Sequence, residues 1–157
     1  MQHPAHAELV PEFLADLAAL PSASRLEDAD VENIYALAYQ LLLQGHYENA
    51  GKHFALLTLY RPTATKFLAG AALCHKMLQR YEAAIGVYAF MCMIEPAEPE
   101  HQLGIAECLL LQGQAQEARD TLALVVRFCA ENPGHELAAQ RAKAIAARLS
   151  TQAADAA

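Results

Sequence analysis

A period of about 34 residues constrains the fold of this chain more than any other feature of its sequence. Alanine recurs with this period at Ala50, Ala84 and Ala118, in the similar settings YENAGKHF, YEAAIGVY and AQEARDTL. Self-similarity at a fixed period of about 20 to 50 residues is the signature of repeat folds, in which each repeat is one supersecondary unit stacked on its neighbours. The sequence therefore predicts three copies of one unit in tandem.

Small and large residues keep the same spacing around these alanines. Small residues precede them by twelve positions and large residues follow them by four: Ala38, Ala72 and Ala106, and Phe54, Tyr88 and Leu122. Two antiparallel helices approach closely only where small side chains face each other, so the alanines predict the crossing inside each hairpin. The large residues are expected to fill the space between successive hairpins. Turn residues follow the same period: Gly45, Gln79 and Gly113, and Pro62 and Pro96.

Composition and punctuation point to helices. Only 7% of the 157 residues are aromatic and none is Trp, which favours close-packed helices over sheets. Asp30 is expected to cap the helix that follows it, and Pro99 suits a first helical position. Helices are expected at about residues 7–20, 31–44, 47–60, 64–78, 81–94, 99–112, 115–131 and 135–149.

The predicted fold is all-α, with three helical hairpins in a short superhelical solenoid, an N-terminal helix and a C-terminal capping helix. Residues 1–24 are expected to form the N-terminal helix and a linker, as a dimerisation arm. The three repeats are placed at residues 31–64, 65–98 and 99–131, and the C-terminal helix at 135–149. Residues 150–157 are expected to be a disordered tail.

Charge and hydropathy exclude several classes of function. A net charge of −7 argues against nucleic-acid binding, which needs a clustered basic surface. The opening segment lacks a cationic region and carries Glu8, Glu12 and Asp16, so it does not resemble a secretory signal. No apolar run approaches the ~18 residues that a membrane-spanning helix needs. A soluble, cytoplasmic protein with no membrane partner is expected.

The cysteines and histidines suggest neither a metal site nor catalysis. The four cysteines are widely spaced without a CxxC pair, and the seven histidines show no paired-ligand spacing. A catalytic thiol would have to be assembled from Cys74, Cys108, His75 and His101. Cys74 and Cys108 lie one repeat period apart, however, as packing at equivalent repeat positions predicts. We therefore expect buried free thiols, no enzyme, no metal and no cofactor.

The small-large signature resembles the tetratricopeptide repeat over Val31 to about Ala130. The aromatic residue that is usual near the start of the first helix is replaced by Ile34, Leu68 and Gln102. The third repeat also lacks the Tyr and the Pro of the other two. The resemblance implies that the first helix of each hairpin lines a concave face.

One stripe of each first helix is therefore predicted to form a binding groove. In the first repeat this stripe consists of Tyr35, Tyr39 and Leu42, at i, i+4 and i+7. The side facing the second helix is expected to carry Leu37, Ala38 and Leu41. The predicted groove continues through Lys66, Ala69, Leu73, Lys76, Leu103, Glu107 and Leu110. Such a surface suits aliphatic anchors and proline rings of an extended peptide, although packing against the N-terminal helix or the next repeat is the alternative.

The N-terminal helix has one apolar face, made of Val10, Phe13, Leu14 and Leu17. Folding back as a cap and pairing with a second copy would both cover this face. Dimerisation is favoured because an exposed apolar helix face suits a self-complementary contact. The C-terminal helix, with Leu137, Ile145 and Leu149 among basic residues, is expected to be a solvating cap.

Three stretches carry a resemblance to one family within the repeat class: IYALAYQLLLQGHYENAGKHFALL, KFLAGAALCHKMLQRYEAAIGVY and AECLLLQGQAQEARDTL. They are similar to the class II chaperones of bacterial type III secretion, the translocator chaperones of the SycD/LcrH type. The resemblance implies a cytoplasmic homodimer that holds an extended N-terminal segment of a hydrophobic translocator, with Pro and Leu anchors, in its groove. Binding would prevent aggregation and premature association before export. Tyr35, Tyr39 and Leu42 match the aromatic pocket positions of the family, with Leu42 in place of a third aromatic.

Two other binding functions stay open at this point. A chaperone for a needle or filament subunit would bind a helix in the groove instead of an extended strand. A generic tetratricopeptide adaptor would capture a C-terminal carboxylate with Lys and Asn at fixed positions of the concave face. Those clamp positions are held here by Tyr35, Tyr39, Gly70 and Gly104.

Overall fold

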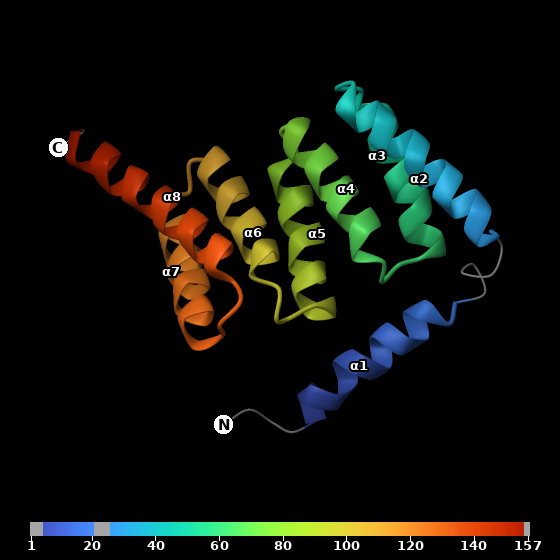
Figure 1. Cartoon of the computed structure of the whole chain (residues 1–157), viewed down its shortest axis with the longest axis horizontal. Coiled ribbons are helices and arrows are strands. Elements are labelled where there is room, and N and C mark those ends of the chain that lie inside the picture. The colour runs from blue at the N-terminus through green and yellow to red at the C-terminus, as the bar shows by residue number, and fades with distance from the viewer. Residues whose placement is uncertain (1–4, 21–25, 156–157) are drawn as a thin grey trace. The chain divides into compact units, whose positions relative to one another are not determined.

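The structure, a computed structural model, describes the backbone of residues 5–20 and 26–155 and the side chains of residues 11–20 and 26–151. All regular secondary structure within these residues is α-helical, which confirms the all-α prediction (Figure 1). The helices are α1 (Ala5–Ala18), α2 (Asp28–Leu43), α3 (Tyr47–Tyr60), α4 (Thr65–Met77), α5 (Tyr81–Ile94), α6 (Pro99–Leu111), α7 (Ala115–Glu131) and α8 (Glu136–Asp155). None of the helices in the described part of the chain combines the length and apolar character that crossing a membrane requires.

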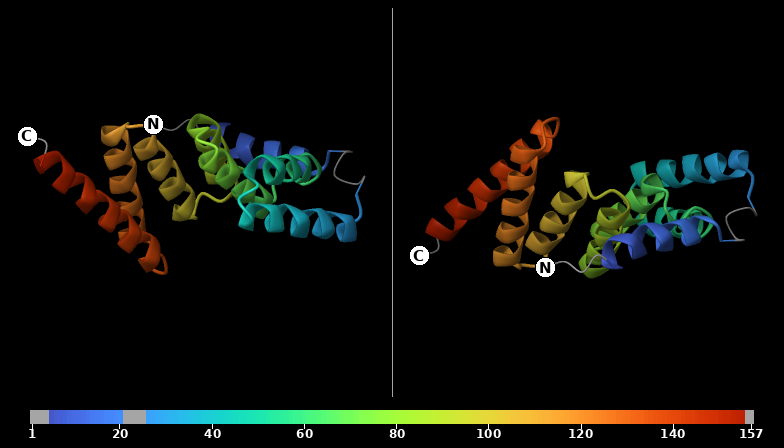
Figure 2. Two further views of the ribbon diagram at one scale, coloured as in Figure 1. Left: turned by 90° about the horizontal axis from the view of Figure 1, so that it is seen from above. Right: turned by 90° about the horizontal axis from the view of Figure 1, so that it is seen from below.

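The first compact unit, residues 1–80, is built around α2, α3 and α4. α2 and α3 form an antiparallel hairpin, and α4 packs against both of them (Figures 1 and 2). Ala38 and Ala50, the small residues predicted at the hairpin crossing, are both wholly buried. The buried core consists of Val31, Ala38, Ala50, Phe54, Leu57, Phe67, Ala71 and Cys74. None of these core residues comes from α1.

The second compact unit, residues 81–157, contains α5 to α8. Each helix packs against the next, and α8 also contacts α6. The buried core of α6, α7 and α8 consists of Leu103, Ala106, Leu122, Val125, Ala138, Ala142 and Leu149. Because α8 supplies three of these residues, it is an integral part of the core of this unit and does more than cover its end.

The helix boundaries differ from the predicted ones mainly at two places. α2 begins at Asp28 and not after Asp30, and Glu27 before it makes no side-chain capping bond. Asp28 and Asp30 lie in the first turn instead, where the positive end of the helix dipole favours carboxylates. α8 continues to Asp155, so the tail predicted from residue 150 is helical to that point. The segment TQAAD, which has two alanines and no Gly or Pro, allows this extension. As predicted, α6 begins at Pro99.

The three first helices end in the same turn, in register with the period of the sequence. Gly45, Gln79 and Gly113 have φ values of 79°, 58° and 82°. After α2, the N–H of Gly45 donates to the Leu42 carbonyl (3.0 Å) and that of His46 to the Leu41 carbonyl (2.9 Å). The same two bonds follow α4 and α6. This is the Schellman motif, and its left-handed residue is normally Gly. Gln79 therefore holds a conformation that is unfavourable for a residue with a side chain.

Rings from second helices lie directly against glycines of the next first helix. A Cβ atom added to Gly70 would come within 2.3 Å of the Phe54 ring, and one added to Gly104 within 2.6 Å of the Tyr88 ring. The first contact, between α3 and α4, lies inside the first unit, and the second, between α5 and α6, lies inside the second unit. The prediction that Phe54 and Tyr88 fill the space between successive hairpins is thus confirmed.

Candidate functional site

An aromatic cluster joins α2, α3 and α4 in the first unit. The Tyr35 ring lies 5.4 Å from the Phe67 ring and 6.2 Å from the Phe54 ring, measured between centroids. Tyr39, one turn further along α2, lies 6.2 Å from Tyr35. Phe54 and Phe67 are buried, Tyr35 is half-buried, and Tyr39 is 48% exposed. Tyr35 and Tyr39 form the outer part of this cluster. We call these two side chains, together with the adjacent Lys66, the aromatic surface.

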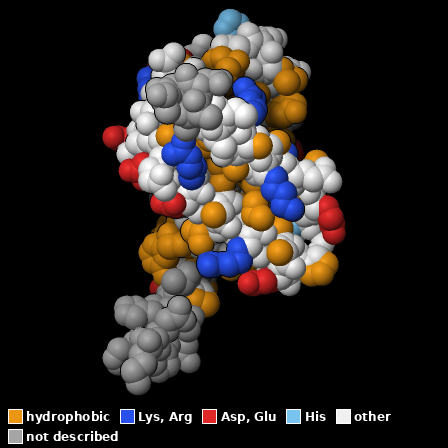
Figure 3. All heavy atoms as spheres, turned by 90° about the vertical axis from the view of Figure 1, so that its left-hand side faces the viewer, with side chains coloured by type: hydrophobic (Ala, Val, Ile, Leu, Met, Phe, Trp, Pro, Cys, Tyr) orange, Lys and Arg blue, Asp and Glu red, His pale blue; other side chains and the backbone are white. Residues whose placement is uncertain are grey.

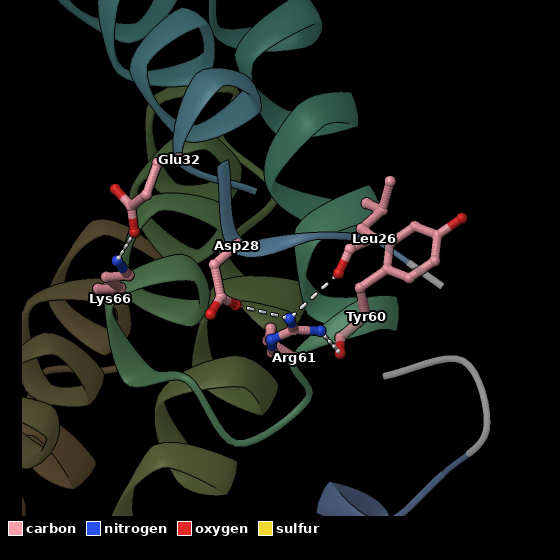
Figure 4. A network of polar contacts seen from close by, with 6 residues as sticks. All are labelled: Leu26, Asp28, Glu32, Tyr60, Arg61 and Lys66. Carbon is pink, nitrogen blue, oxygen red and sulfur yellow. Dashed lines mark hydrogen bonds and ion pairs between the residues drawn. The ribbon is translucent and has the colours of Figure 1, made fainter. Parts of the chain in front are cut away.

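Lys66 lies at the edge of the aromatic surface. Its Nζ lies 5.0 Å from the Tyr35 ring centroid and 4.9 Å from that of Phe67, within the range of cation–π attraction. The same Nζ donates to Glu32 Oε1 at 2.6 Å (Figure 4). Both partners are about half exposed, so the ion pair adds little to stability. The pair holds the ammonium close to the rings of Tyr35 and Phe67.

Arg61, directly after α3, fixes the start of α2. Its guanidinium donates to the Leu26 carbonyl (3.3 Å), to Asp28 Oδ1 (3.0 Å) and to the Tyr60 carbonyl (3.1 Å), as Figure 4 shows. These bonds connect the start of α2 to the end of α3. They hold the two helices of the hairpin together at the end away from the α2–α3 turn, and the aromatic surface lies on this hairpin.

The remaining residues predicted for the groove in this unit differ in accessibility. Leu42 is half-buried and packs on the core. Ala69 is exposed, whereas Leu73 and Lys76 are partly buried on α4. Leu37, which was expected to face α3, is 46% exposed, while Ala38 and Leu41 pack as expected. Tyr39 is thus the predicted groove side chain in α2 that offers the most accessible apolar surface.

The prediction for the third repeat is wrong at Leu103. This side chain is wholly buried in the core shared by α6, α7 and α8, so a peptide cannot contact it. Leu110 is half-buried against the same core. Glu107 pairs through Oε1 with Arg141 of α8 at 3.0 Å. The sequence period placed these residues on one stripe but did not reveal that α8 covers part of it.

A cleft lies between α8 and the end of the α6–α7 hairpin. Its volume is about 690 Å³. Its lining consists of Glu107, Leu110, Leu111, Gly113, Ala115, Ile145, Arg148 and Leu149. We call it the α6–α8 cleft. Ile145 and Arg148 were not predicted as site residues, because the C-terminal helix was interpreted only as a cap.

The carboxylate-clamp alternative does not fit the geometry. Two of the clamp positions are Gly70 and Gly104, and the rings of Phe54 and Tyr88 lie where their side chains would begin. A Lys or Asn side chain cannot be accommodated there without moving the ring of Phe54 or that of Tyr88.

The environments of the buried thiols and of His75 and His101 differ from residue to residue. All four cysteines are free, with Cys74 and Cys108 buried and Cys92 and Cys129 half-buried. Burial raises the pKa of the Cys74 thiol and, together with Arg80, lowers the pKa of His75, so the charged form of each is disfavoured. The Nδ1 atom of His75 has no hydrogen-bond partner among the described residues. His101 is buried and bonds to Glu95 Oε2 at 2.9 Å.

Part of the apolar face of α1 is accessible. Phe13 is 52% exposed, and Leu14 and Leu17 are half-buried. The side chain of Val10 lies outside the described residues. These placements leave Phe13 available for contact with another surface.

The chain is similar in sequence to proteins of known class. A sequence model of the family described as "Tetratricopeptide repeat" matches residues 31–63, the first predicted repeat. The low calcium response locus protein H of Yersinia pseudotuberculosis is 28% identical over 121 residues, which make up 77% of this chain and 72% of that protein.

Solved structures extend the similarity to the fold. PcrH, in complex with the chaperone binding region of PopD, matches with a TM-score of 0.72 at 26% identity, over 82% of this chain and 96% of that chain. PcrH comes from Pseudomonas aeruginosa. The Yersinia enterocolitica type III secretion chaperone SycD, in complex with a peptide of the translocator YopD, matches with a TM-score of 0.71 at 26% identity, over 82% of this chain and 98% of that chain. Another SycD structure is described as an alternative dimer. These relatives confirm the resemblance inferred from the three repeat stretches.

Proposed function

We propose that this chain, a tetratricopeptide-repeat relative of the type III secretion translocator chaperones, is itself a chaperone for a hydrophobic translocator. It would bind an extended N-terminal segment of its client and so prevent aggregation and premature association before export. The relatives PcrH and SycD have been solved with segments of PopD and YopD, respectively, and the fold is shared over 82% of this chain. The client of this chain would be the equivalent protein of its own secretion system.

The observation that carries the proposal is the aromatic surface of the first unit. Tyr39 leaves about half of its side chain exposed, while Tyr35 beside it is anchored on buried rings. Exposed aromatic side chains with few rotatable bonds give large contact area at a low entropic cost. Tyrosine hydroxyls and the Lys66 ammonium can meet peptide carbonyls beside the apolar contact. This combination suits an extended segment with Pro and Leu anchors.

Binding alone would account for the activity. Masking an apolar segment lowers the concentration of the aggregating species by mass action and needs neither a nucleotide nor a catalytic group. We therefore propose a cytoplasmic binding protein without enzymatic activity, acting where translocators are made. The homodimer seen for relatives would form through α1, with Phe13 as its central contact.

The test is the affinity of the purified chain for N-terminal peptides of the translocator encoded beside it, measured by fluorescence anisotropy. Tyr39→Ala should weaken binding about tenfold, which corresponds to ~1.4 kcal/mol, because buried aromatic anchors dominate such interfaces. Tyr39 is the better choice than Tyr35, whose removal would also disturb the core.

Leu37→Ala is the matched control. Leu37 lies on the same helix, is 46% exposed and points to another side of α2 two residues away. Its variant should bind like the wild type. Equal affinities for all three proteins would exclude the aromatic surface, and failure of the wild type to bind any peptide would exclude the proposed function.

A further inference from the structure

α8 stands in the place of a first helix in a further repeat. Ala138 lies one sequence period after Gly104, just as Gly104 lies one period after Gly70. Ala138 is buried in one cluster with Leu122, the residue equivalent to Phe54 and Tyr88. Ala138 and Leu122 thus share one buried core of α6, α7 and α8, at the repeat positions that form the small-against-large contacts between α3 and α4 and between α5 and α6.

Ion pairs show the same correspondence. Glu32 on α2 pairs with Lys66 on α4, and Glu107 on α6 pairs with Arg141 on α8. In both pairs the partners are one sequence period apart. α6 and α8 therefore present neighbouring groove positions in the second unit, as α2 and α4 do in the first.

The α6–α8 cleft is apolar inside. Leu110, Ile145 and Leu149 belong to or pack on the core of this unit, so the cleft is formed on a fixed base. Its volume of about 690 Å³ lies within the ~300–1,000 Å³ typical of sites that bury a ligand. An aliphatic side chain of a peptide fits this lining better than a polar one.

The charged side chains that line the cleft are Glu107 and Arg148. Arg141 of α8 binds both Glu107 and Glu100, so its single positive charge offsets part of the charge of these two carboxylates. Arg148 also lines the cleft, and within the described side chains no ion pair is formed by its guanidinium. From Leu137 to Thr151 the sequence has three basic residues and no acidic one, in a chain of net charge −7. Figure 3 shows basic, acidic and apolar side chains interspersed on the side where α7 and α8 lie.

We propose that the α6–α8 cleft is a second client site, which takes an aliphatic side chain of an extended segment while Arg148 pairs with a carboxylate two residues away. Side chains at i and i+2 of an extended chain point to the same side, which sets this spacing. The proposal rests on the proposed function, because it assigns a further part of the same client to this cleft. It also predicts that a client carries an aliphatic-x-acidic segment apart from the one held by Tyr39.

The test uses overlapping fluorescent peptides that cover the translocator encoded beside this chain. A peptide with the aliphatic-x-acidic pattern should bind, and Arg148→Glu should weaken it about fivefold to tenfold, because attraction is replaced by repulsion at a partly enclosed site. Lys143→Glu makes the same charge change on the same helix, but Lys143 does not line the cleft, so this control should bind like the wild type. Thermal unfolding followed by circular dichroism checks that both variants are folded.

Charge reversal in the peptide sharpens the test. A peptide with Lys in place of its acidic residue should bind poorly to the wild type and recover affinity for the Arg148→Glu variant. Equal losses in Arg148→Glu and Lys143→Glu, or no loss in either, would overturn the proposal even if Tyr39→Ala weakens its own peptide. A halved mass of the Arg148→Glu variant with unchanged peptide affinity would show instead that the cleft contacts a second copy. If no peptide binds the wild type, the proposed function and this inference both fail.

Discussion

Gln79 lies in the left-handed region of backbone conformation, where the other two repeats have Gly45 and Gly113. A side chain costs roughly 1–2 kcal/mol in this region, and it stays there because the Schellman bonds of the turn require it. These bonds are the same as at Gly45 and Gly113, so they give Gln79 no compensation that the two glycines lack. The turn after α4 is therefore the strained member of three otherwise equivalent turns.

Replacing this residue should stabilise the protein. Gln79→Gly removes the backbone strain but adds flexibility to the unfolded chain, which leaves a net gain of about 0.5–1 kcal/mol in the free energy of unfolding. Urea denaturation followed by circular dichroism measures the change. The reciprocal variant Gly45→Gln should lose a similar amount. If Gln79→Gly brought no gain and Gly45→Gln no loss, the assignment of strain would be contradicted.

Predictions for single residues are limited because sequence periodicity shows which residues share a helix face but not which other helix covers that face. Spacing alone placed Tyr35 and Tyr39 together on α2, and the aromatic contacts agree. The same spacing placed Leu103 in the groove, although it is wholly buried. Burial at that position depends on α8, a helix distant in sequence whose docking no local pattern reveals. The offset of one period between Glu107 and Arg141, and that between Gly104 and Ala138, were available signals of it.

At the scale of helices, packing between hairpins depends on two glycines that have no room for a side chain. Phe54 is 1% exposed and its ring lies against Gly70, so the ring has no free space into which it could move if Gly70 carried a side chain. The length and order of the helices were predictable because prolines and glycines at the turns follow the period. The end of α8 was not, because its alanine-rich final turns carry no stop signal.

Gly70→Ala should destabilise the first unit by about 2–3 kcal/mol, since the added methyl group overlaps the buried Phe54 ring. Gly86→Ala is the control, because a Cβ atom added at Gly86 in α5 meets nothing within 4 Å. That variant should gain about 0.5–1 kcal/mol from its higher helix propensity. Both are measured as midpoints of urea unfolding. The packing explanation would be untenable if the two substitutions shifted the midpoint in the same direction.

At the scale of the whole molecule, we propose that the exposed part of α1 forms the contact with a second copy of the chain. Phe13→Asp places a charge where an apolar contact is proposed, so the mass in analytical ultracentrifugation should fall from that of two copies to that of one. Glu12→Lys changes the charge of the neighbouring exposed residue and should leave the mass unchanged. If the Phe13→Asp variant were still a dimer, the contact between the two copies would have to lie on another surface.

The ion pairs between neighbouring first helices also give a small preference for one order of stacking of the hairpins. Glu32 meets Lys66, and Glu107 meets Arg141, always with the acid on the earlier helix and the base on the later one. Hairpins so alike in shape could otherwise stack out of sequence, or exchange between two chains during synthesis, as repeat proteins tend to do. A first repeat docked on another first repeat would bring two Glu32 carboxylates side by side. The acidic and basic partners thus differ between repeats whose helices are otherwise similar, and this difference favours stacking in the order of the sequence.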